Sequence, residues 1–132
     1  MKIGVDTNIL VRALTDDDPA QAALAKDAMA ASETIAVSTV ALCELVWVLK
    51  RGYGLSDSAI KAALKTIMTT AAISIDRPAV EAGFAVFDAG GDFADGIIAH
   101  QARALGGDTF VSFDRRAIAA LTSVGVAARL LD

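Results

Sequence analysis

Short apolar segments alternate with helical segments along the whole chain, and this alternation restricts the fold more than any other feature. The apolar segments have the length and composition of buried strands, and they lie at residues 2–5, 34–37, 72–75, 109–113 and 126–131. Between them, apolar residues recur every three or four positions, as in helices that cover a sheet with one face. Strands separated by helices pair in parallel, so we predict a three-layer α/β/α fold. Its mainly parallel central sheet is covered by helices on both faces.

Residues that start and stop helices divide the chain further. Asp or Ser residues suited to the N-cap position stand before four helical segments, at Asp6, Asp18, Ser38 and Ser56. Glycine pairs that can end a helix follow two later segments, at residues 90–91 and 106–107. No linker, repeat or low-complexity tract interrupts this order. We therefore expect residues 1–132 to form a single domain.

The apolar content bears on location and partners. The chain is 55% hydrophobic with a mean hydropathy of +0.51, yet no apolar run approaches the roughly 20 residues that cross a bilayer. The first residues lack the long apolar stretch of a signal peptide, and a single cysteine, Cys43, cannot form an internal disulfide. We expect a cytoplasmic protein with no membrane partner. Its surplus apolar surface predicts an oligomer or a stable complex.

Acidic residues stand where the site of an α/β fold forms. Asp6 and Asp114 each follow a predicted strand and precede a helix, and Asp95 lies in the first turn of the helix after the glycine pair at 90–91. Ligands of such folds bind at the carboxyl ends of the strands. However, Asp6 and Asp114 also fit helix N-caps, and Asp92 with Asp95 resembles a capping box. Both interpretations stay open for each residue taken alone.

Glu44 is the most informative of the acids. Its helical neighbours three and four positions away are all apolar: Val40, Ala41, Trp47 and Val48. An unpaired ionised carboxylate on an apolar face lowers the stability of the fold by several kcal/mol or becomes protonated. The nearby Lys50 and Arg51 fall on other faces of the helix and cannot pair with it. A bound cation would resolve this cost. Asp95 similarly precedes a predicted core face, formed by Ile98, Ala102 and Leu105, and we expect its carboxylate at the edge of the core.

Short oxygen-bearing side chains accompany these acids and suggest a hard metal ion. Thr7 and Asn8 follow Asp6, and strand alternation points Ser112 to the same side as Asp114. Such groups can orient a carboxylate or a water molecule, although exposed polar residues fit the same positions. Mg²⁺ and Mn²⁺ take oxygen ligands. Zinc is disfavoured because the chain has one histidine and one cysteine.

The net charge is compatible with a nucleic-acid substrate without indicating one. A net charge of −4 and a pI near 4.8 argue against broad electrostatic binding of nucleic acid. Setting aside Asp6, Glu44, Asp95 and Asp114, the remaining 12 acids equal the 12 Lys and Arg residues. Two divalent ions would cancel the charge of the four acids.

Taken together, these motifs resemble a PIN domain. They are Asp6-Thr7-Asn8 after the first strand, the lone Glu44 of the third helix, the segment Asp-Phe-Ala-Asp-Gly-Ile-Ile-Ala at residues 92–99, and Ser112-Phe113-Asp114. More narrowly, the chain is similar over its full length to the VapC-like toxins of bacterial and archaeal toxin–antitoxin pairs. One departure is Gly96, which stands where alanine is frequent in the family.

The resemblance implies a Mg²⁺- or Mn²⁺-dependent endoribonuclease. It implies that four carboxylates hold the metal and carry catalysis, those of Asp6, Glu44, Asp95 and Asp114, with Asp92 as an outer group and Thr7, Asn8 and Ser112 in support. It also implies a homodimer and a cognate antitoxin whose C-terminal segment inserts over the acidic site. In this mechanism, metal-activated water attacks the RNA phosphate in line and leaves a 5′-phosphate and a 3′-hydroxyl.

Five basic residues could contact the RNA backbone. The predicted phosphate contacts, which also fit ordinary helix-surface charge, are Lys50, Arg51, Arg103, Arg115 and Arg116.

The main alternative to a nuclease is a catalytically inactive α/β interaction module whose acids are helix caps. A phosphoryl-transfer receiver or phosphatase domain is disfavoured because the last lysine of the chain is Lys65, far before Asp95.

Overall fold

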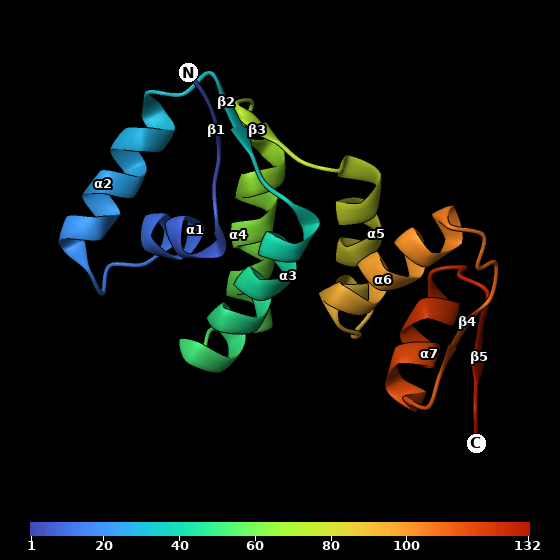
Figure 1. Ribbon diagram of the computed structural model, residues 1–132. Helices are drawn as coiled ribbons and strands as arrows, with labels where there is room; N and C mark the ends of the chain where they lie inside the picture. The colour runs from blue at the N-terminus through green and yellow to red at the C-terminus, as the bar shows by residue number, and fades with distance from the viewer. The chain divides into compact units, whose positions relative to one another are not determined.

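All five strands pair in parallel, and they form two sheets (Figure 1). The computed structural model describes residues 1–132 and divides them into two units, Met1–Asp76 (unit 1) and Arg77–Asp132 (unit 2). Unit 1 contains a three-stranded sheet of order β1-β2-β3, and unit 2 contains the pair β4-β5. The α/β class predicted from the alternation is confirmed. The union of both units in one domain with one central sheet stays a prediction.

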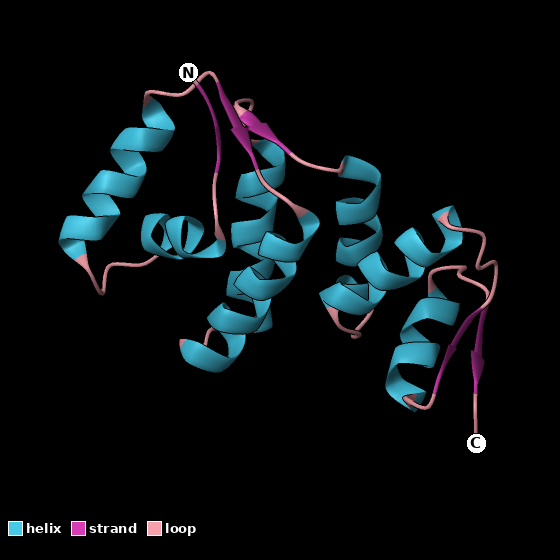
Figure 2. Ribbon diagram, in the orientation of Figure 1, coloured by secondary structure: helices cyan, strands magenta, loops and turns pink.

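Unit 1 follows the predicted order of elements, with strands shorter by one or two residues (Figure 2). Its elements are β1 (Lys2–Gly4), α1 (Thr7–Leu14), α2 (Pro19–Ala30), β2 (Thr34–Ala36), α3 (Thr39–Trp47), the π-helical turn η1 (Val48–Gly52), α4 (Asp57–Thr69) and β3 (Ile73–Ser74). In the sheet, Ile35 of β2 lies beside Ile3 on one side and Ile73 on the other. Ile35 is 3% exposed, so the middle of this small sheet belongs to the core.

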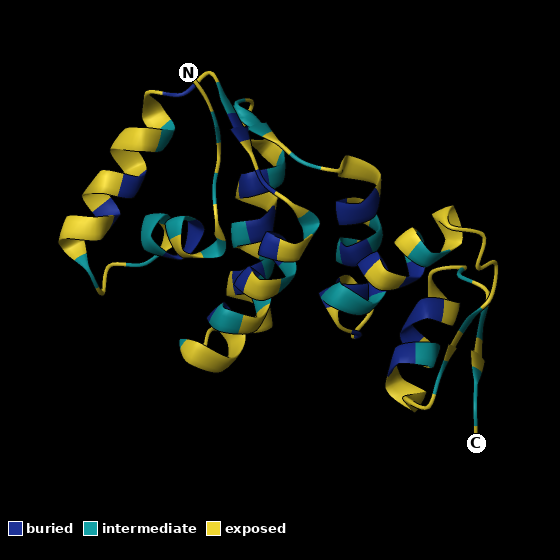
Figure 3. Cartoon of the chain, in the orientation of Figure 1, coloured by how far each residue is buried: buried dark blue, intermediate teal, exposed yellow.

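The helices of unit 1 begin where the sequence indicated. The side chains of four N-cap residues each accept the backbone N–H three positions ahead, those of Asp6, Asp18, Ser38 and Ser56. These interactions satisfy N–H groups that have no partner within the helix. α1 then packs against α2 and α3. In contrast, α2 is mostly exposed, with Ala22 and Ala25 as its buried residues (Figure 3).

Unit 2 is built on a close contact between two helices. Its elements are α5 (Arg77–Asp88), α6 (Phe93–Ala104), β4 (Phe110–Ser112), α7 (Arg115–Ser123) and β5 (Ala128–Leu130). α5 packs on α6, and a Cβ atom added at Gly96 of α6 would lie 2.6 Å from the carbonyl oxygen of Ala82 and 2.7 Å from Cα of Gly83. The family's frequent alanine therefore has no room at position 96. Glycine at this position allows the two backbones to approach each other closely.

The buried face of α6 differs from the predicted one. Ile98 and Leu105 are 53% and 90% exposed, so the predicted core face was wrong. The buried residues of α6 are Phe93, Gly96, Ile97 and Ala99. The contact at Gly96 decides this orientation, because it turns the glycine side of the helix toward α5. The periodicity of apolar residues in α6 fits either face.

Glycines also end the helices of unit 2. Gly90 has φ = 93°, its N–H donates to the carbonyl of Phe87, and the N–H of Gly91 donates to the carbonyl of Val86 over 2.9 Å. This is a Schellman motif, which satisfies the last carbonyls of α5. The same pattern ends α6 at Gly106 and Gly107. Both predicted helix stops are confirmed.

The structure also bears on membrane insertion and on surface composition. None of the helices has the length and apolar character required to span a bilayer. Several large apolar side chains are nevertheless exposed, including Val40 (66%), Trp47 (65%) and Phe113 (81%). Exposed apolar surface of this kind is typical of contact surfaces.

Candidate active site

In unit 1, four of the predicted polar residues line one open hollow of about 510 Å³, together with Ser38. They are Asp6, Thr7, Asn8 and Glu44. The strand β1 leads directly to Asp6, and the packing of α1 against α3 brings Thr7 to Glu44 across 37 positions of sequence. The Thr7 hydroxyl lies 3.3 Å from Oε2 of Glu44 and 3.4 Å from the carbonyl oxygen of Ala41, and it donates toward both. These residues therefore gather at the carboxyl end of β1, and their role as ligands stays a prediction.

Asp6 uses one of its two carboxylate oxygens as a helix cap. Its Oδ1 accepts the N–H of Ile9 over 3.0 Å, which is the helix-cap role. Its Oδ2 has no partner within the chain, and the side chain is exposed to the hollow. One carboxylate can cap α1 and still offer an oxygen to a ligand.

Glu44 is not in the apolar environment that the sequence suggested. It is exposed, and so are Val40 and Trp47 on either side of it. The buried residues of α3 are Ala41, Leu42 and Leu45. The prediction of a buried carboxylate was therefore wrong, because the neighbours that made the face look like core are themselves at the surface.

In unit 2, three acids come from two helix starts. Asp114 follows β4 and caps α7, since its Oδ1 accepts the N–H groups of Arg116 over 2.9 Å and Ala117 over 3.1 Å. Ser112 supports this turn because its hydroxyl accepts the N–H of Asp114 over 3.0 Å. Asp92 occupies the N-cap position of α6, but its side chain accepts no capping hydrogen bond. The predicted capping box is therefore wrong at Asp92.

Asp95 carries the strongest sign of a functional carboxylate. It is half-buried in the first turn of α6, and this burial raises its pKa above the ordinary value. The negative charges of Asp92 and Asp114 raise the pKa of Asp95 further. The three carboxylates are thus close enough to repel one another, and repulsion among oxygen ligands is what a divalent cation relieves. Carboxylate oxygens are the donors that Mg²⁺ and Mn²⁺ prefer, but these three carboxylates do not converge closely enough to form a metal site by themselves.

The four principal acids divide evenly between the units. Asp6 and Glu44 belong to unit 1, and Asp95 and Asp114 belong to unit 2. Within neither unit do three His, Cys, Asp or Glu side chains converge closely enough to hold a metal ion. Neither unit by itself forms a metal site, and the meeting of all four acids stays a prediction.

Comparison with known proteins identifies the family. The model of the PIN domain family matches residues 3–122. The chain belongs to the PIN-domain family. No curated protein and no solved structure matches it. PIN domains are generally metal-dependent nucleases, so membership assigns the chain to that broad class of hydrolases acting on nucleic acids.

The basic residues predicted to contact RNA have different surroundings in this PIN domain. Lys50 pairs with Asp57 at 3.2 Å, and Arg115 pairs with Asp132 at 3.7 Å. Nε of Arg116 donates to the carbonyl of Gly90 over 2.9 Å. The two remaining residues, Arg51 and Arg103, are exposed and have no ion-pair partner. A role in binding RNA stays a prediction for all five, and Arg51 and Arg103 keep their charges most available.

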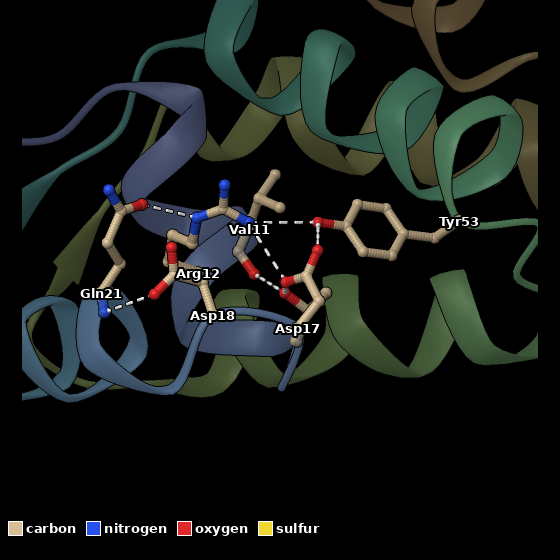
Figure 4. A network of polar contacts seen from close by, with 7 residues as sticks. Val11, Arg12, Asp17, Asp18, Gln21 and Tyr53 are labelled. Carbon is tan, nitrogen blue, oxygen red and sulfur yellow. Dashed lines mark hydrogen bonds and ion pairs between the residues drawn. The ribbon is translucent and has the colours of Figure 1, made fainter.

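A polar network in unit 1 was not apparent from the sequence (Figure 4). Asp17, in the loop between α1 and α2, accepts hydrogen bonds from the Tyr53 hydroxyl over 2.7 Å and the Thr15 hydroxyl over 2.9 Å. Arg12 adds an ion pair to Asp17 at 3.1 Å. The hydrogen bond from Tyr53, followed by that from Thr15, lowers the pKa of Asp17. The network ties the end of η1 to α1, the helix that begins beside Asp6.

Proposed function

We propose that the chain is a Mg²⁺- or Mn²⁺-dependent endoribonuclease that acts in the cytoplasm as the toxin of a toxin–antitoxin pair. The observation that carries the proposal is the half-buried Asp95, whose pKa is raised by burial and by Asp92 and Asp114. Mutual repulsion among carboxylates destabilises the folded state, and functional sites are where such arrangements are common. The PIN-domain match supports a nuclease.

Four carboxylates would hold the metal: those of Asp6, Glu44, Asp95 and Asp114. When bound, a divalent cation would lower the pKa of a water molecule and neutralise negative charge that develops on the phosphate. The chain's own groups orient the ligands. Thr7 holds Oε2 of Glu44, and the two N–H groups at the start of α7 hold Oδ1 of Asp114, which leaves Oδ2 available.

Water is the nucleophile in this proposal. The chain's one histidine, His100, lies on α6 more than a turn after Asp95, and this arrangement offers no Ser-His-Asp triad. The oxygen of water bonds to phosphorus, the bond from phosphorus to the 3′-oxygen breaks, and the 3′-oxygen takes up a proton. The products are a 5′-phosphate and a 3′-hydroxyl.

We also propose a homodimer and a cognate antitoxin as protein partners. The exposed apolar side chains of Val40 and Trp47 flank Glu44 on α3, and Phe113 precedes Asp114. Apolar surface beside the proposed ligands suits a protein segment that covers the site. This surface, rather than any charge pattern, supports the partner proposal.

An RNase assay with matched variants tests the activity. We expect cleavage of labelled RNA that requires Mg²⁺ or Mn²⁺ and stops in excess chelator. Asp95→Asn and Glu44→Gln should each lower the rate of RNA cleavage about 100-fold or more. Even outer partners of metal ligands contribute about 10–100-fold to metal affinity or activity. Asp18→Asn is the control, since Asp18 caps α2 outside the acid group and asparagine retains the cap. Equal cleavage by all these proteins would mean a contaminating nuclease.

The alternative of an inactive interaction module has one observation in its favour. Asp6 and Asp114 do serve as helix caps, as that alternative requires. Calorimetric titration with Mn²⁺ separates the two functions. Caps alone bind no stoichiometric metal, whereas the nuclease binds one or two equivalents that Asp95→Asn abolishes or weakens.

A further inference from the structure

We propose that Arg116 is a positioning residue, which anchors the loop between α5 and α6 so that Asp92 is presented beside Asp95 and Asp114. This inference rests on the proposed function, because it concerns how unit 2 arranges carboxylates toward a cation. From the sequence, Arg116 fits either a contact to the RNA backbone or an ordinary surface charge. The structure gives its guanidinium a different partner.

The first support is the contact from Arg116 to the loop. Nε of Arg116 donates to the carbonyl oxygen of Gly90 over 2.9 Å, across 26 positions of sequence. Gly90 is the left-handed residue of the Schellman motif that ends α5, so its carbonyl lies beyond the helix and needs a partner elsewhere. Arg116 provides that partner from the first turn of α7.

The second support is that the same residue contacts Asp114. The backbone N–H of Arg116 donates to Oδ1 of Asp114 over 2.9 Å. Arg116 therefore joins the turn that carries Asp114, through its main chain, to the loop that carries Asp92, through its side chain. Arg116 thus provides a polar link between the two segments that carry these acids.

The third support is the packing of the loop between these contacts. A Cβ atom at Gly91 would lie 2.7 Å from Cβ of Ala120 and 2.8 Å from Cγ1 of Val86. Gly91 thus rests directly against α7, and Asp92 follows it in sequence. The loop has two anchors on α7, of which Arg116 is the polar one.

The fourth support is that Asp92 stands at the N-cap position of α6 without capping the helix. It occupies the N-cap position of α6, yet its side chain accepts no capping hydrogen bond, whereas Asp114 caps α7 twice. An aspartate at this position would normally gain stability from the cap. The exposed carboxylate of Asp92 instead adds negative charge beside Asp95. This arrangement suits a group that faces a cation.

The direction of one effect distinguishes positioning from charge. Arg116→Met removes a positive charge near the carboxylates. By electrostatics alone this change should strengthen Mn²⁺ binding, because the metal ion is no longer repelled by the guanidinium. Loss of position should weaken it. Arg115→Met is the matched control, because Arg115 carries the same charge one residue earlier but pairs with Asp132 at the exposed surface.

Calorimetric titration of the full chain with Mn²⁺ tests the inference. We expect Arg116→Met to weaken Mn²⁺ binding about tenfold, as outer partners of metal ligands do, and Arg115→Met to bind Mn²⁺ as wild type or more tightly. Asp92→Asn should also weaken binding. If Arg116 acts through Asp92, the variant with both substitutions should bind Mn²⁺ no more weakly than the single variant that binds it less well. If the two residues act independently, the fold-losses in Mn²⁺ affinity should multiply.

Amide hydrogen exchange of the metal-free protein gives a readout that needs no metal. In Arg116→Met, the amides of Gly90 and Gly91 should exchange faster than in wild type. Those of Gly106 and Gly107 end α6 with the same motif and should be unchanged. Wild-type exchange at Gly90 and Gly91, or wild-type Mn²⁺ affinity in Arg116→Met, overturns the inference. Failure of the proposed function is distinguishable, because the wild-type protein itself would then bind no Mn²⁺.

Discussion

The two units handle their acidic residues differently. In unit 1, Asp6 is bonded to a backbone N–H and Glu44 to the Thr7 hydroxyl, and both side chains are exposed. In unit 2, Asp95 is half-buried beside two further carboxylates, and this raises its pKa. The unfavourable electrostatics of the proposed site are therefore concentrated in unit 2. A cation would benefit that unit most, because relief of repulsion adds to coordination.

The two units also differ in how tightly their backbones pack. In unit 2, a Cβ atom at Gly83, Gly91 or Gly96 would come within 3.0 Å of a neighbouring atom. In unit 1, a Cβ atom added at Gly4 would have no neighbour within 4 Å, and one at Gly52 would meet Cγ1 of Val48 at an ordinary 3.7 Å. In unit 2, Asp92 and Asp95 thus stand next to glycines, Gly91 and Gly96, whose backbones pack closely against neighbouring segments.

The largest expected effect tests this difference in packing. Gly96→Ala should lower the free energy of unfolding by about 3 kcal/mol, because the added methyl group meets backbone atoms of α5 that cannot move aside. Gly4→Ala is the control in unit 1 and should change it by less than about 0.5 kcal/mol. Denaturant unfolding monitored by circular dichroism measures both. Similar values for the two variants would remove the contrast between the units.

A smaller effect separates capping from charge. Asp114→Ala should cost about 1–2 kcal/mol of stability because two N–H groups of α7 lose their acceptor. Asp6→Ala should cost less, since Asp6 caps one N–H group. Asp114→Asn retains an acceptor and should unfold nearly as wild type while weakening Mn²⁺ binding. If asparagine restored both stability and metal affinity, Asp114 would be a cap and nothing more.

The smallest effect sharpens the electrostatic comparison. Because the folded pKa of Asp95 is raised, the folded state holds its proton more tightly than the unfolded state. The stability that this proton contributes is present at low pH and lost as pH rises through the folded pKa. In metal-free protein, Asp95→Asn should therefore unfold at a higher temperature than wild type at neutral pH, with the difference vanishing at about pH 3.

The matched change in unit 1 is Glu44→Gln. It should leave the unfolding temperature nearly unchanged at both pH values, because the Glu44 side chain is exposed and shares no cluster of acids in its unit. Thermal unfolding across this pH range measures both variants. A gain in stability at neutral pH for Glu44→Gln, equal to that of Asp95→Asn, would contradict the concentration of repulsion in unit 2.

Much of the local structure could be predicted from the sequence. The caps at Asp6, Asp18, Ser38 and Ser56 and the helix stop at Gly90 are all confirmed. Each depends on hydrogen bonds between residues at most five positions apart, so the local sequence contains all the groups involved. The order of elements and the PIN-domain family follow from the same local signals.

Other features were decided by tertiary structure. Sequence periodicity could not show that Glu44 lies at the surface among exposed apolar residues, that α6 buries its glycine face, or that Asp92 caps nothing. The partner of Arg116 was equally hidden, since Gly90 is 26 positions away.

By itself, then, the sequence determined where helices and strands begin and end and which acids stand at strand ends. Only the tertiary structure decided which side chains are buried and which charges lie close together. The physical reason is that burial and electrostatic repulsion depend on the approach of distant segments, such as the close approach of α6 to α5 at Gly96.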